Sequence, residues 1–463
     1  MSERILIIGG DAAGMSAASR IVRVQPNVRV TVLEREGVVS YGACGMPYHL
    51  DGRIPNQNTL LIRSPSDFAE LGIDVRLHHE AVAIDPEAGK VTVRRGDGAV
   101  SVEPYDQLLI ATGATPIIPP VPGVEAANVF VFRRYDDLTL LSDYLEGRDS
   151  ARITIVGGGY IGVELADVLM ARGLSVTLVE MSDSLFPRTL DSDMARIVEA
   201  ELRDRGADLR LGSRVAEFGT QDGLVHRVLT QDEAWNCDVV ILASGTRPAA
   251  DLAREAGIAL DGFGAVATNS RLRASLPNVW AAGDCTSTVN LVTGQPAWVP
   301  LGPAANKQGR VVGSNLAGSR QIFGGVVGTA LAQVCRLAVG RTGLTEMEAV
   351  EAGLHATTTV ITAGDRAPYY PGGEPTTVKI IAETGTGRLL GAQIVGRNGV
   401  PGRTNVIATA LHANMTIDAL ASLDLGYAPP FSPVWDPLLV AANTLLPKVG
   451  TGIDTAMHGR DGS

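Results

Sequence analysis

The stretch RILIIGGDAAG, residues 4–14, decides the fold of this chain. Its apolar first half predicts a buried strand, and Gly9 and Gly14 predict a tight turn that leads into a closely packed helix. Residues 28–34 then predict a second parallel strand, which ends at Glu34. This is the opening βαβ unit of a dinucleotide-binding fold, in which the helix N-terminus faces a pyrophosphate.

The same pattern returns in RITIVGGGYIG, residues 152–162. This second fingerprint has all three of its glycines, Gly157, Gly159 and Gly162. The strand that follows ends at Glu180. A carboxylate there accepts hydrogen bonds from a free ribose 2′-hydroxyl and repels a 2′-phosphate, so we expect NADH to be preferred, with NADPH as the alternative.

Three further strand ends fit a flavin. Residues 107–113 predict a strand that ends in a tight turn, and residues 239–245 repeat this pattern after the second unit. Asp284 closes another apolar strand, where a buried carboxylate costs several kcal/mol unless it is satisfied. A ribityl hydroxyl would satisfy it, so these features with the first turn predict FAD. The residues predicted to bind the two cofactors are Gly9, Gly14, Glu34, Arg35, Val82, Ala111, Thr112, Gly113, Gly157, Gly159, Tyr160, Ile161, Gly162, Glu164, Glu180, Gly245, Gly283 and Asp284.

Composition excludes several classes of function. The 463 residues are 45% hydrophobic and 19% charged, as expected of an α/β enzyme of two or three domains. A net charge of −11 argues against a nucleic-acid or anionic-membrane partner. We find no signal peptide and no apolar stretch of membrane-spanning length, and the four cysteines have neither disulfide nor metal spacing. We therefore expect a cytoplasmic protein without a metal site.

These patterns predict an α/β fold with two Rossmann-like dinucleotide-binding domains and a third domain of mixed α+β type. The predicted FAD domain consists of residues 1–115 and 245–325, and the NAD(P)H domain consists of residues 116–244. Alternating patterns in residues 326–450 predict antiparallel strands with helices, and residues 451–463 predict a flexible tail.

Cys44 lies in SYGACGMPY, residues 40–48, with no other cysteine nearby. Gly42 and Gly45 permit close approach of another group, and Ser40 offers a hydroxyl. We predict that the cysteine lies near a helix start, whose dipole would favour the thiolate. We therefore predict that Cys44 is a single redox thiol that acts with a flavin. We expect Cys237, Cys285 and Cys335 to be packing residues.

Jointly, these motifs resemble the flavin- and pyridine-nucleotide-dependent disulfide reductases, in particular their single-cysteine branch. The resemblance runs from Arg4 to about Lys448 and includes YAPPFS, residues 427–432. It implies that residues 326–450 form a dimerisation domain and that the protein is a homodimer with shared active sites. It also implies that Tyr369 and Tyr427 of the partner subunit reach the cysteine, with Tyr427 as a general acid for a departing thiolate.

Within this branch, the oxidases and peroxidases carry a histidine where this chain has Ala12, which argues against a peroxide-handling site. The C-terminal motifs resemble those of coenzyme A (CoA) disulfide reductases. By this resemblance, the substrate is a CoA disulfide or persulfide, and the positions that contact it are Ser16, Arg20, Arg23, Asn306, Trp435 and Asn443.

The sequence leaves three functions open. The favoured one is NAD(P)H-driven, FAD-dependent reduction of a low-molecular-weight disulfide or persulfide through Cys44, with Ser40, Tyr369 and Tyr427 assisting. The second is an NADH oxidase or peroxidase that uses a Cys44 sulfenate. The third is a flavoprotein electron donor or redox-responsive binding protein in which Cys44 is incidental.

Overall fold

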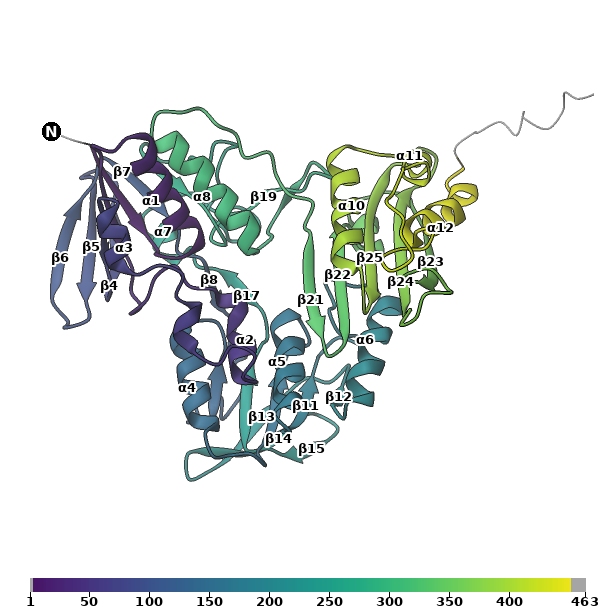
Figure 1. The fold of residues 1–463 in the computed structure, drawn as a ribbon. Coiled ribbons are helices and arrows are strands. Elements are labelled where there is room, and N and C mark those ends of the chain that lie inside the picture. The colour runs from purple at the N-terminus through teal and green to yellow at the C-terminus, as the bar shows by residue number, and fades with distance from the viewer. Residues whose placement is uncertain (1–2, 451–463) are drawn as a thin grey trace, which may run out of the picture. The chain divides into compact units, whose positions relative to one another are not determined.

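The computed structural model describes residues 3–450, so the predicted tail at 451–463 lies outside the described residues. Contacts divide the chain into two compact units. The first unit consists of residues 3–181, Ser213–Asn290 and Gln295–Val326. The second consists of Ser182–Gly212, Leu291–Gly294 and residues 327–450. Figure 1 shows the elements of each unit.

A five-stranded parallel sheet organises the first βαβ unit. Its strand order is β18-β7-β1-β2-β3, so the first strand of the chain lies at the centre. The strands are β1 (Arg4–Ile8), β2 (Arg29–Leu33), β3 (Ile73–Arg76), β7 (Gln107–Ile110) and β18 (Val279–Ala281). In the four strands other than the edge strand β3, most side chains are buried and apolar, as expected of strands that are covered on both faces.

Two helices cover this sheet together, α1 (Ala12–Val24) and α8 (Gly302–Leu316), which lie side by side in Figure 1. Small residues let them approach closely. A Cβ added at Gly309 would lie 2.3 Å from the carbonyl oxygen of Ala13, and one at Gly313 would lie 2.6 Å from that of Ala17. This close packing fixes residues of α8 beside those of α1, although the two helices are almost 300 residues apart.

The second βαβ unit has a parallel sheet that contains β11, β10, β16 and β9 in that order. The bounds are β9 (Val129–Val131), β10 (Arg152–Val156), β11 (Ser175–Val179) and β16 (Val239–Leu242). Its helices are α4 (Tyr135–Leu145) and α5 (Tyr160–Ala171). The turn and helix after β10 therefore match those after β1, as the internal repeat predicts.

Short elements complete the first unit. They are η1 (Ala43–Gly45), α2 (Met46–Leu50), η2 (Gln57–Leu60), α3 (Pro65–Glu70), β4 (His79–Asp85), β5 (Lys90–Arg95), β6 (Val100–Pro104), β8 (Ala114–Pro116), β13 (Glu217–Gln221), β14 (Leu224–Leu229), β15 (Ala234–Asn236), β17 (Thr246–Pro248), α7 (Asp251–Glu255), β19 (Thr288–Val289) and β20 (Pro296–Ala297). Strands β8 and β17 pair as antiparallel neighbours directly after the two predicted tight turns.

The second unit is built on an antiparallel sheet of order β21-β22-β25-β24-β23. Helices α10 and α12 pack on this sheet and enclose an aliphatic core. The elements are α6 (Ser192–Asp204), β12 (Asp208–Arg210), β21 (Ala330–Val334), β22 (Leu337–Gly343), α9 (Glu346–Glu351), β23 (Ala356–Gly364), β24 (Pro375–Glu383), β25 (Leu389–Gly396), α10 (Val400–His412), α11 (Ile417–Ala421), α12 (Pro437–Leu445) and η3 (Leu446–Lys448).

A buried ammonium group joins α6 to this sheet. Lys379 of β24 is only 3% exposed and lies within 3.1 Å of carboxylate oxygens of Asp191, Asp193 and Glu346. A buried charge is tolerated only when it is paired in this way. The segment Ser182–Gly212 is thereby tied to the second unit, although in the sequence it follows β11 of the first unit.

The predicted α/β class, with two Rossmann-like units and an α+β region, is confirmed. The exact domain boundaries stay a prediction. Among residues 3–450, no helix has both the length and the apolar character needed to cross a membrane.

Candidate active site and nucleotide sites

The first glycine turn is held by contacts that only glycine allows. Gly9 has a φ of +110°, and a Cβ there would lie 2.2 Å from the carbonyl oxygen of Ala111. A Cβ at Gly14 would lie 1.9 Å from the carbonyl oxygen of Gly9. Glu34 closes the turn, because its Oε2 accepts a hydrogen bond of 2.7 Å from the backbone N–H of Gly10. The start of α1 can therefore approach a phosphate closely.

The second turn repeats this geometry almost atom for atom. Gly157 has a φ of +114°, and its Cβ would lie 2.3 Å from the carbonyl oxygen of Ala243. Glu180 Oε2 accepts a hydrogen bond of 2.7 Å from the N–H of Gly158, as Glu34 does in the first turn. Gly159 has no atom near its Cβ direction within 4 Å, which leaves space for a ligand beside the backbone. Tyr160 begins α5 directly after this turn.

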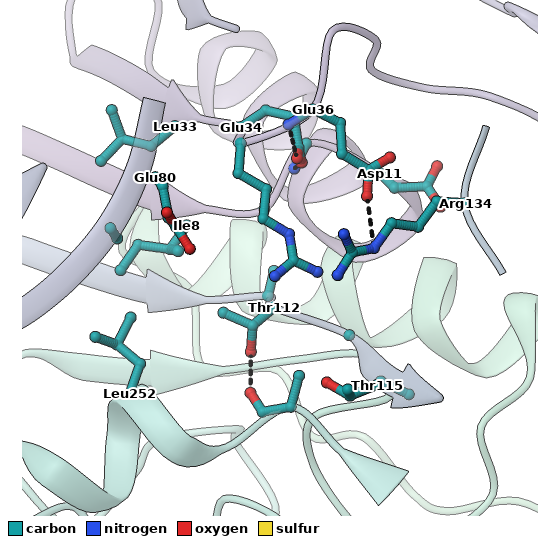
Figure 2. A pocket seen from close by; sticks show the side chains of 18 of the residues that line it. Ile8, Asp11, Leu33, Glu34, Glu36, Glu80, Thr112, Thr115, Arg134 and Leu252 are labelled. Atoms are coloured by element: carbon teal, nitrogen blue, oxygen red, sulfur yellow. Dashed lines mark hydrogen bonds and ion pairs between the residues drawn. The ribbon is translucent and has the colours of Figure 1, made fainter. Parts of the chain in front are cut away.

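A cavity of about 310 Å³ opens beside the first turn, where β1, β2 and β7 end (Figure 2). Six residues predicted to bind a cofactor line it, namely Gly9, Glu34, Arg35, Ala111, Thr112 and Gly113. Thr112 donates a hydrogen bond of 2.6 Å to the carbonyl oxygen of Ala249, which fixes the loop after β7 against the loop after β17. The glycine cradle, the cavity and the carboxylate at the strand end fit an adenine dinucleotide such as FAD.

Three other residues predicted to bind a cofactor, Val82, Gly283 and Gly245, do not line this cavity themselves. Val82 is the extra residue of a β-bulge in β4, next to Ala81, which lines the cavity. The N–H of Gly283 donates to Gln308 Oε1 at 2.6 Å, which ties the end of β18 to α8. Gly245 mirrors Gly113, since both have positive φ at the ends of equivalent strands.

Sequence reasoning missed two adjacent arginines in the cavity wall. Arg133 lies 2.9 Å from Asp284 Oδ2, and Arg134 lies 3.3 Å from Glu36 Oε1. They precede α4 and lie more than a hundred residues beyond the fingerprint, so only folding brings them to it. The available signal in the sequence was a pair of adjacent cations in an acidic chain.

Three carboxyl groups at or near the cavity wall have raised pKa values. Burial raises the pKa of Asp11 to about 6, opposed by Arg133. Burial, followed by the charge of Glu34, raises the pKa of Glu36 to about 7. Burial also raises the pKa of Asp284, while Arg133 lowers it. Near neutral pH, part of the negative charge that would repel a pyrophosphate is thus neutralised by protons or by Arg133 and Arg134.

Cys44 lies one residue beyond the cavity wall. It is exposed and belongs to η1, and its neighbour Ala43 lines the cavity, as does Tyr41. Ser40 has a φ of +52°, which is rare for a residue other than glycine, and its N–H donates to the carbonyl oxygen of Gly10. The thiol-bearing loop is therefore tied directly to the first glycine turn.

The expected lowering of the Cys44 pKa is wrong for the polypeptide. Desolvation raises the pKa of the thiol, the charge of Glu164 adds to this, and Arg133 opposes it. The helix that follows, α2, has only five residues, so its dipole is too small to outweigh nearby carboxylates. Glu164 lies on α5, so the thiol is flanked by the first nucleotide cavity and by the helix of the second nucleotide unit.

Tyr369 and Tyr427 meet in the second unit. Their hydroxyl oxygens are 2.7 Å apart, although 58 residues separate them in the chain. A phenol is protonated at neutral pH, and the hydrogen bond to Tyr369 raises the pKa of Tyr427 further. Tyr369 is 72% exposed and Tyr427 is 46% exposed. The structure thus brings together the two tyrosines that the sequence singled out, with a proton available for donation.

Four of the predicted substrate contacts lie along the α1–α8 pair. Ser16 donates to Asn306 Oδ1 at 2.7 Å, and Arg20 Nε donates to Ser314 Oγ at 2.8 Å. Arg23 is exposed in the last turn of α1. The other two contacts, Trp435 and Asn443, line a shallow hollow in the second unit together with Val440 and Thr444.

Sequence reasoning missed two further cations on α8, Lys307 and Arg310, which are exposed. Helices α1 and α8 contain no carboxylate, while the rest of the chain is strongly acidic. Residues 306, 310 and 314 lie on one stripe of α8 at i, i+4 spacing, so Arg310 lies between the two side-chain pairs that join α8 to α1. The helix pair is therefore a locally basic surface.

Comparison with known proteins decides the family. The profile of the pyridine nucleotide-disulphide oxidoreductases matches residues 3–309, and the dimerisation domain of the same family matches residues 329–438. The chain belongs to this family. Its members use FAD and NAD(P)H, so the protein is an oxidoreductase with these cofactors, and the predicted resemblance and dimerisation domain are confirmed.

Individual relatives match over nearly the whole chain. The "NAD(P)H sulfur oxidoreductase (CoA-dependent)" of Pyrococcus abyssi is 39% identical over 445 residues, which cover 96% of this chain and 98% of that protein. An NADH oxidase of Methanocaldococcus jannaschii is 34% identical, with 96% and 99% covered. The solved NAD-dependent persulfide reductase of A. fulgidus has a TM-score of 0.93 at 38% identity, covering 96% of this chain and 83% of that one.

The carboxylate beside the thiol provides a test of the site's electrostatics. Burial raises the pKa of Glu164 to about 7, so Glu164 is charged above that pH and neutral below it. Glu164→Gln removes this charge and should lower the pKa of Cys44. We expect iodoacetamide to alkylate Cys44 roughly two to five times faster in the variant at pH 8.5, which corresponds to a fraction of one pKa unit.

At pH 6 the two proteins should react at equal rates, because Glu164 is already protonated there. The measurement is the alkylation rate of the dithiothreitol-reduced, FAD-loaded enzyme across this pH range. Glu36→Gln is the matched control, since Glu36 is also partly buried with a pKa of about 7 and is not among the main charges that act on Cys44. A Glu164→Gln effect that does not vary with pH would argue against this electrostatic coupling.

Proposed function

We propose that this protein reduces a low-molecular-weight disulfide or persulfide, with a CoA disulfide or CoA persulfide favoured, through the single redox thiol of Cys44. One observation carries the proposal: Cys44 is the exposed thiol beside the nucleotide cavity, and no second cysteine accompanies it. Cys237 and Cys285 are buried, and Cys335 lies in the turn between β21 and β22. The substrate itself must then supply the second sulfur.

The reaction needs few protein groups. FAD and NAD(P)H, when held at the two glycine turns, would together supply an electron pair at the sulfur of Cys44. The Cys44 thiolate attacks one sulfur of the substrate, a mixed disulfide forms, and the other half leaves as a thiolate. The electron pair then breaks the mixed disulfide, which releases the second thiolate and regenerates the Cys44 thiolate. Ser40 holds the loop that carries this sulfur.

The departing thiolate needs a proton, and the Tyr369–Tyr427 pair is suited to give it. Tyr427 is protonated at neutral pH, as any phenol is, and its hydroxyl lies 2.7 Å from that of Tyr369. We propose that the pair acts on the cysteine of the partner subunit, so that the enzyme is a homodimer with shared active sites. The exposed aromatic side chains around the pair, those of Tyr370, Phe431 and Trp435, support an interface there.

The basic surface of α1 and α8 favours a substrate that carries phosphates. Arg20, Arg23, Lys307 and Arg310 supply its positive charge, while Ser16 and Asn306 offer neutral donors. CoA has several phosphate groups, and its nucleotide part has a flat base that an exposed Trp435 side chain could stack against, beside Asn443. The names of the CoA-dependent relatives agree with this assignment.

NADH is the proposed electron donor, with NADPH as the alternative. Glu180 ends the second strand of its nucleotide unit, and the N–H of Gly158 holds one of its oxygens. A carboxylate fixed in this position disfavours a 2′-phosphate.

The intact mass of the non-reduced, denatured protein tests this function. We expect an increment of one CoA that dithiothreitol removes and that peptide mapping places on Cys44. No mass increment, together with no NADH-dependent turnover of CoA disulfide, CoA persulfide or polysulfide, would refute the proposal.

A second function is an NADH oxidase or peroxidase, and the relative named NADH oxidase favours it. It would use a Cys44 sulfenate, and Ala12 at the start of α1 offers no acid–base group for peroxide. In the same mass measurement, this function predicts a reversible increment of one oxygen. NADH would also be consumed rapidly with oxygen or peroxide alone.

A further inference from the structure

Two loops of the second unit present the tyrosine pair. Residues 365–374 join β23 to β24 and carry Tyr369, while residues 422–436 join α11 to α12 and carry Tyr427. Neither loop has regular secondary structure at its tyrosine, and both tyrosines are exposed residues. The separation of 2.7 Å between the hydroxyls therefore depends on what holds the two loops to each other.

A buried arginine on a third element contacts both loops. Arg403 lies in the first turn of α10 and is 6% exposed. Its Nη2 donates to the carbonyl oxygen of Asp365 at 3.0 Å, where the first loop begins. The same nitrogen lies 2.9 Å from Asp436 Oδ2, where the second loop ends.

The contacts of Arg403 use the planar shape of its guanidinium group. Nε also donates to Asp436 Oδ1 at 3.2 Å while Nη2 contacts Oδ2, which makes the ion pair bidentate. Asp436 is 7% exposed and also accepts from Ser432 Oγ at 3.0 Å and from the N–H of Leu438 at 2.9 Å. The carboxylate thereby orders the end of its loop and the start of α12 at once.

The first loop is held from its own side by a second buried carboxylate. Asp365 is 2% exposed and accepts from Asn398 Nδ2 at 2.6 Å and from the N–H of Glu374 at 3.0 Å, which closes the loop at its base. The two loops also meet directly, because the N–H of Ala367 donates to the carbonyl oxygen of Pro429. Arg403 joins these two networks.

The residue that precedes α10 is a glycine, and only a glycine leaves room for the guanidinium group of Arg403. Gly399 has a φ of +73°, and a Cβ there would lie 2.4 Å from Arg403 Nη1. A larger side chain at this position would displace the guanidinium group. The position of the Arg403 guanidinium group therefore depends on glycine at residue 399.

We infer that Arg403 is a positioning residue for the Tyr369–Tyr427 pair: its guanidinium group holds the two tyrosine-bearing loops at the spacing that lets the hydroxyls bond. The inference rests on the proposed role of these tyrosines as proton donors to the departing thiolate. Arg403 itself touches neither hydroxyl and acts through Asp365 and Asp436. A lysine would keep the charge but cannot make the bidentate pair and reach Asp365 as well.

Arg403→Lys in the FAD-loaded enzyme tests this role, with CoA disulfide as the substrate. We expect kcat to fall roughly tenfold to hundredfold, as for a misplaced catalytic group, with KM nearly unchanged. Anaerobic reduction of FAD by NADH should keep its wild-type rate. In a Tyr427→Phe background, Arg403→Lys should cause no further loss, because the group that it positions is already gone.

Arg388→Lys is the matched control. Arg388 belongs to the same unit, pairs with Glu383 at 3.3 Å and donates to the carbonyl oxygen of Val292, but contacts neither loop. Asp436→Asn is a second variant in case Arg403→Lys does not fold, since the amide keeps an acceptor for Leu438. It should cause a smaller loss of kcat that also disappears in the Tyr427→Phe background.

Two results would overturn this inference alone. Equal loss of kcat from Arg403→Lys with and without Tyr427 would show that the arginine acts through general stability. Wild-type kcat in Arg403→Lys, alongside a slow Tyr427→Phe, would show that the loops do not need it. Wild-type kcat in Tyr427→Phe itself would instead refute the role proposed for the tyrosine, and this inference with it.

Discussion

Replacing Cys44 with serine is expected to abolish disulfide reduction while the protein still binds FAD and reduces it with NADH. The hydroxyl of serine cannot form a mixed disulfide, so the electron pair has no route to the substrate. Loss of a catalytic nucleophile lowers kcat by roughly a thousandfold or more. NADH-dependent turnover of CoA disulfide measures this loss, and the flavin absorbance under anaerobic NADH measures the step that should survive.

Cys335→Ser is the control for the Cys44 experiment. Cys335 is also partly exposed, but it lies in a hairpin turn of the second unit. We expect this variant to keep wild-type turnover. Undiminished disulfide reduction by Cys44→Ser would refute the proposed function, whereas loss of FAD from that variant would only show that the loop also supports the cavity.

The second large effect is expected at Gly157. Gly157→Ala should destabilise the second nucleotide unit by roughly 3 kcal/mol or more, because alanine would be strained at a φ of +114° and would overlap the carbonyl oxygen of Ala243. Reduction of FAD by NADH should then slow at least about tenfold, as expected when the pyrophosphate turn is displaced. Because the first turn is untouched, FAD should stay bound.

Gly173→Ala is the control that separates the cost of a positive φ from the cost of steric overlap. Gly173 follows α5 in the same nucleotide unit and also has a positive φ, of +84°, but nothing lies within 4 Å of its Cβ direction. It should therefore show only the modest cost of the backbone conformation and bind NADH normally. Thermal unfolding and stopped-flow flavin reduction compare the two variants, and equal effects of both would mean that the contact with Ala243 is unimportant.

Much of the fold could be predicted from local pattern. Each glycine fingerprint follows a short apolar strand and precedes a helix, because the turn, the close helix packing and the phosphate approach all require small residues at set spacings. The strand-end carboxylates Glu34 and Glu180 were predictable for the same reason. The structure shows the same hydrogen bond at both, accepted from the N–H of the residue after the first fingerprint glycine, which is Gly10 or Gly158.

The site was only partly predictable. Arg133 enters the cavity from a loop outside the fingerprint, and nothing in its local sequence indicates that it pairs with Asp284. The pKa of Cys44 was predicted in the wrong direction because folding desolvates the thiol, and Glu164, from α5, adds a charge that the motif around the cysteine does not contain. Both errors concern contacts between residues more than a hundred positions apart.

For the tyrosines, too, the sequence identified the residues and the structure showed their contact. A resemblance of motifs singled out Tyr369 and Tyr427, but only the folded second unit brings their hydroxyls together, through loops that Arg403 joins.

Repeated short-range spacing was therefore enough to indicate the two nucleotide folds, FAD, and a lone redox thiol, because glycine turns and strand ends follow local stereochemistry. The tertiary structure alone decided the charges around that thiol, the arginines of the cavity and the pairing of the tyrosines. Electrostatic and hydrogen-bonding partners depend on distance in space, and distance in space is set only when remote segments pack against one another.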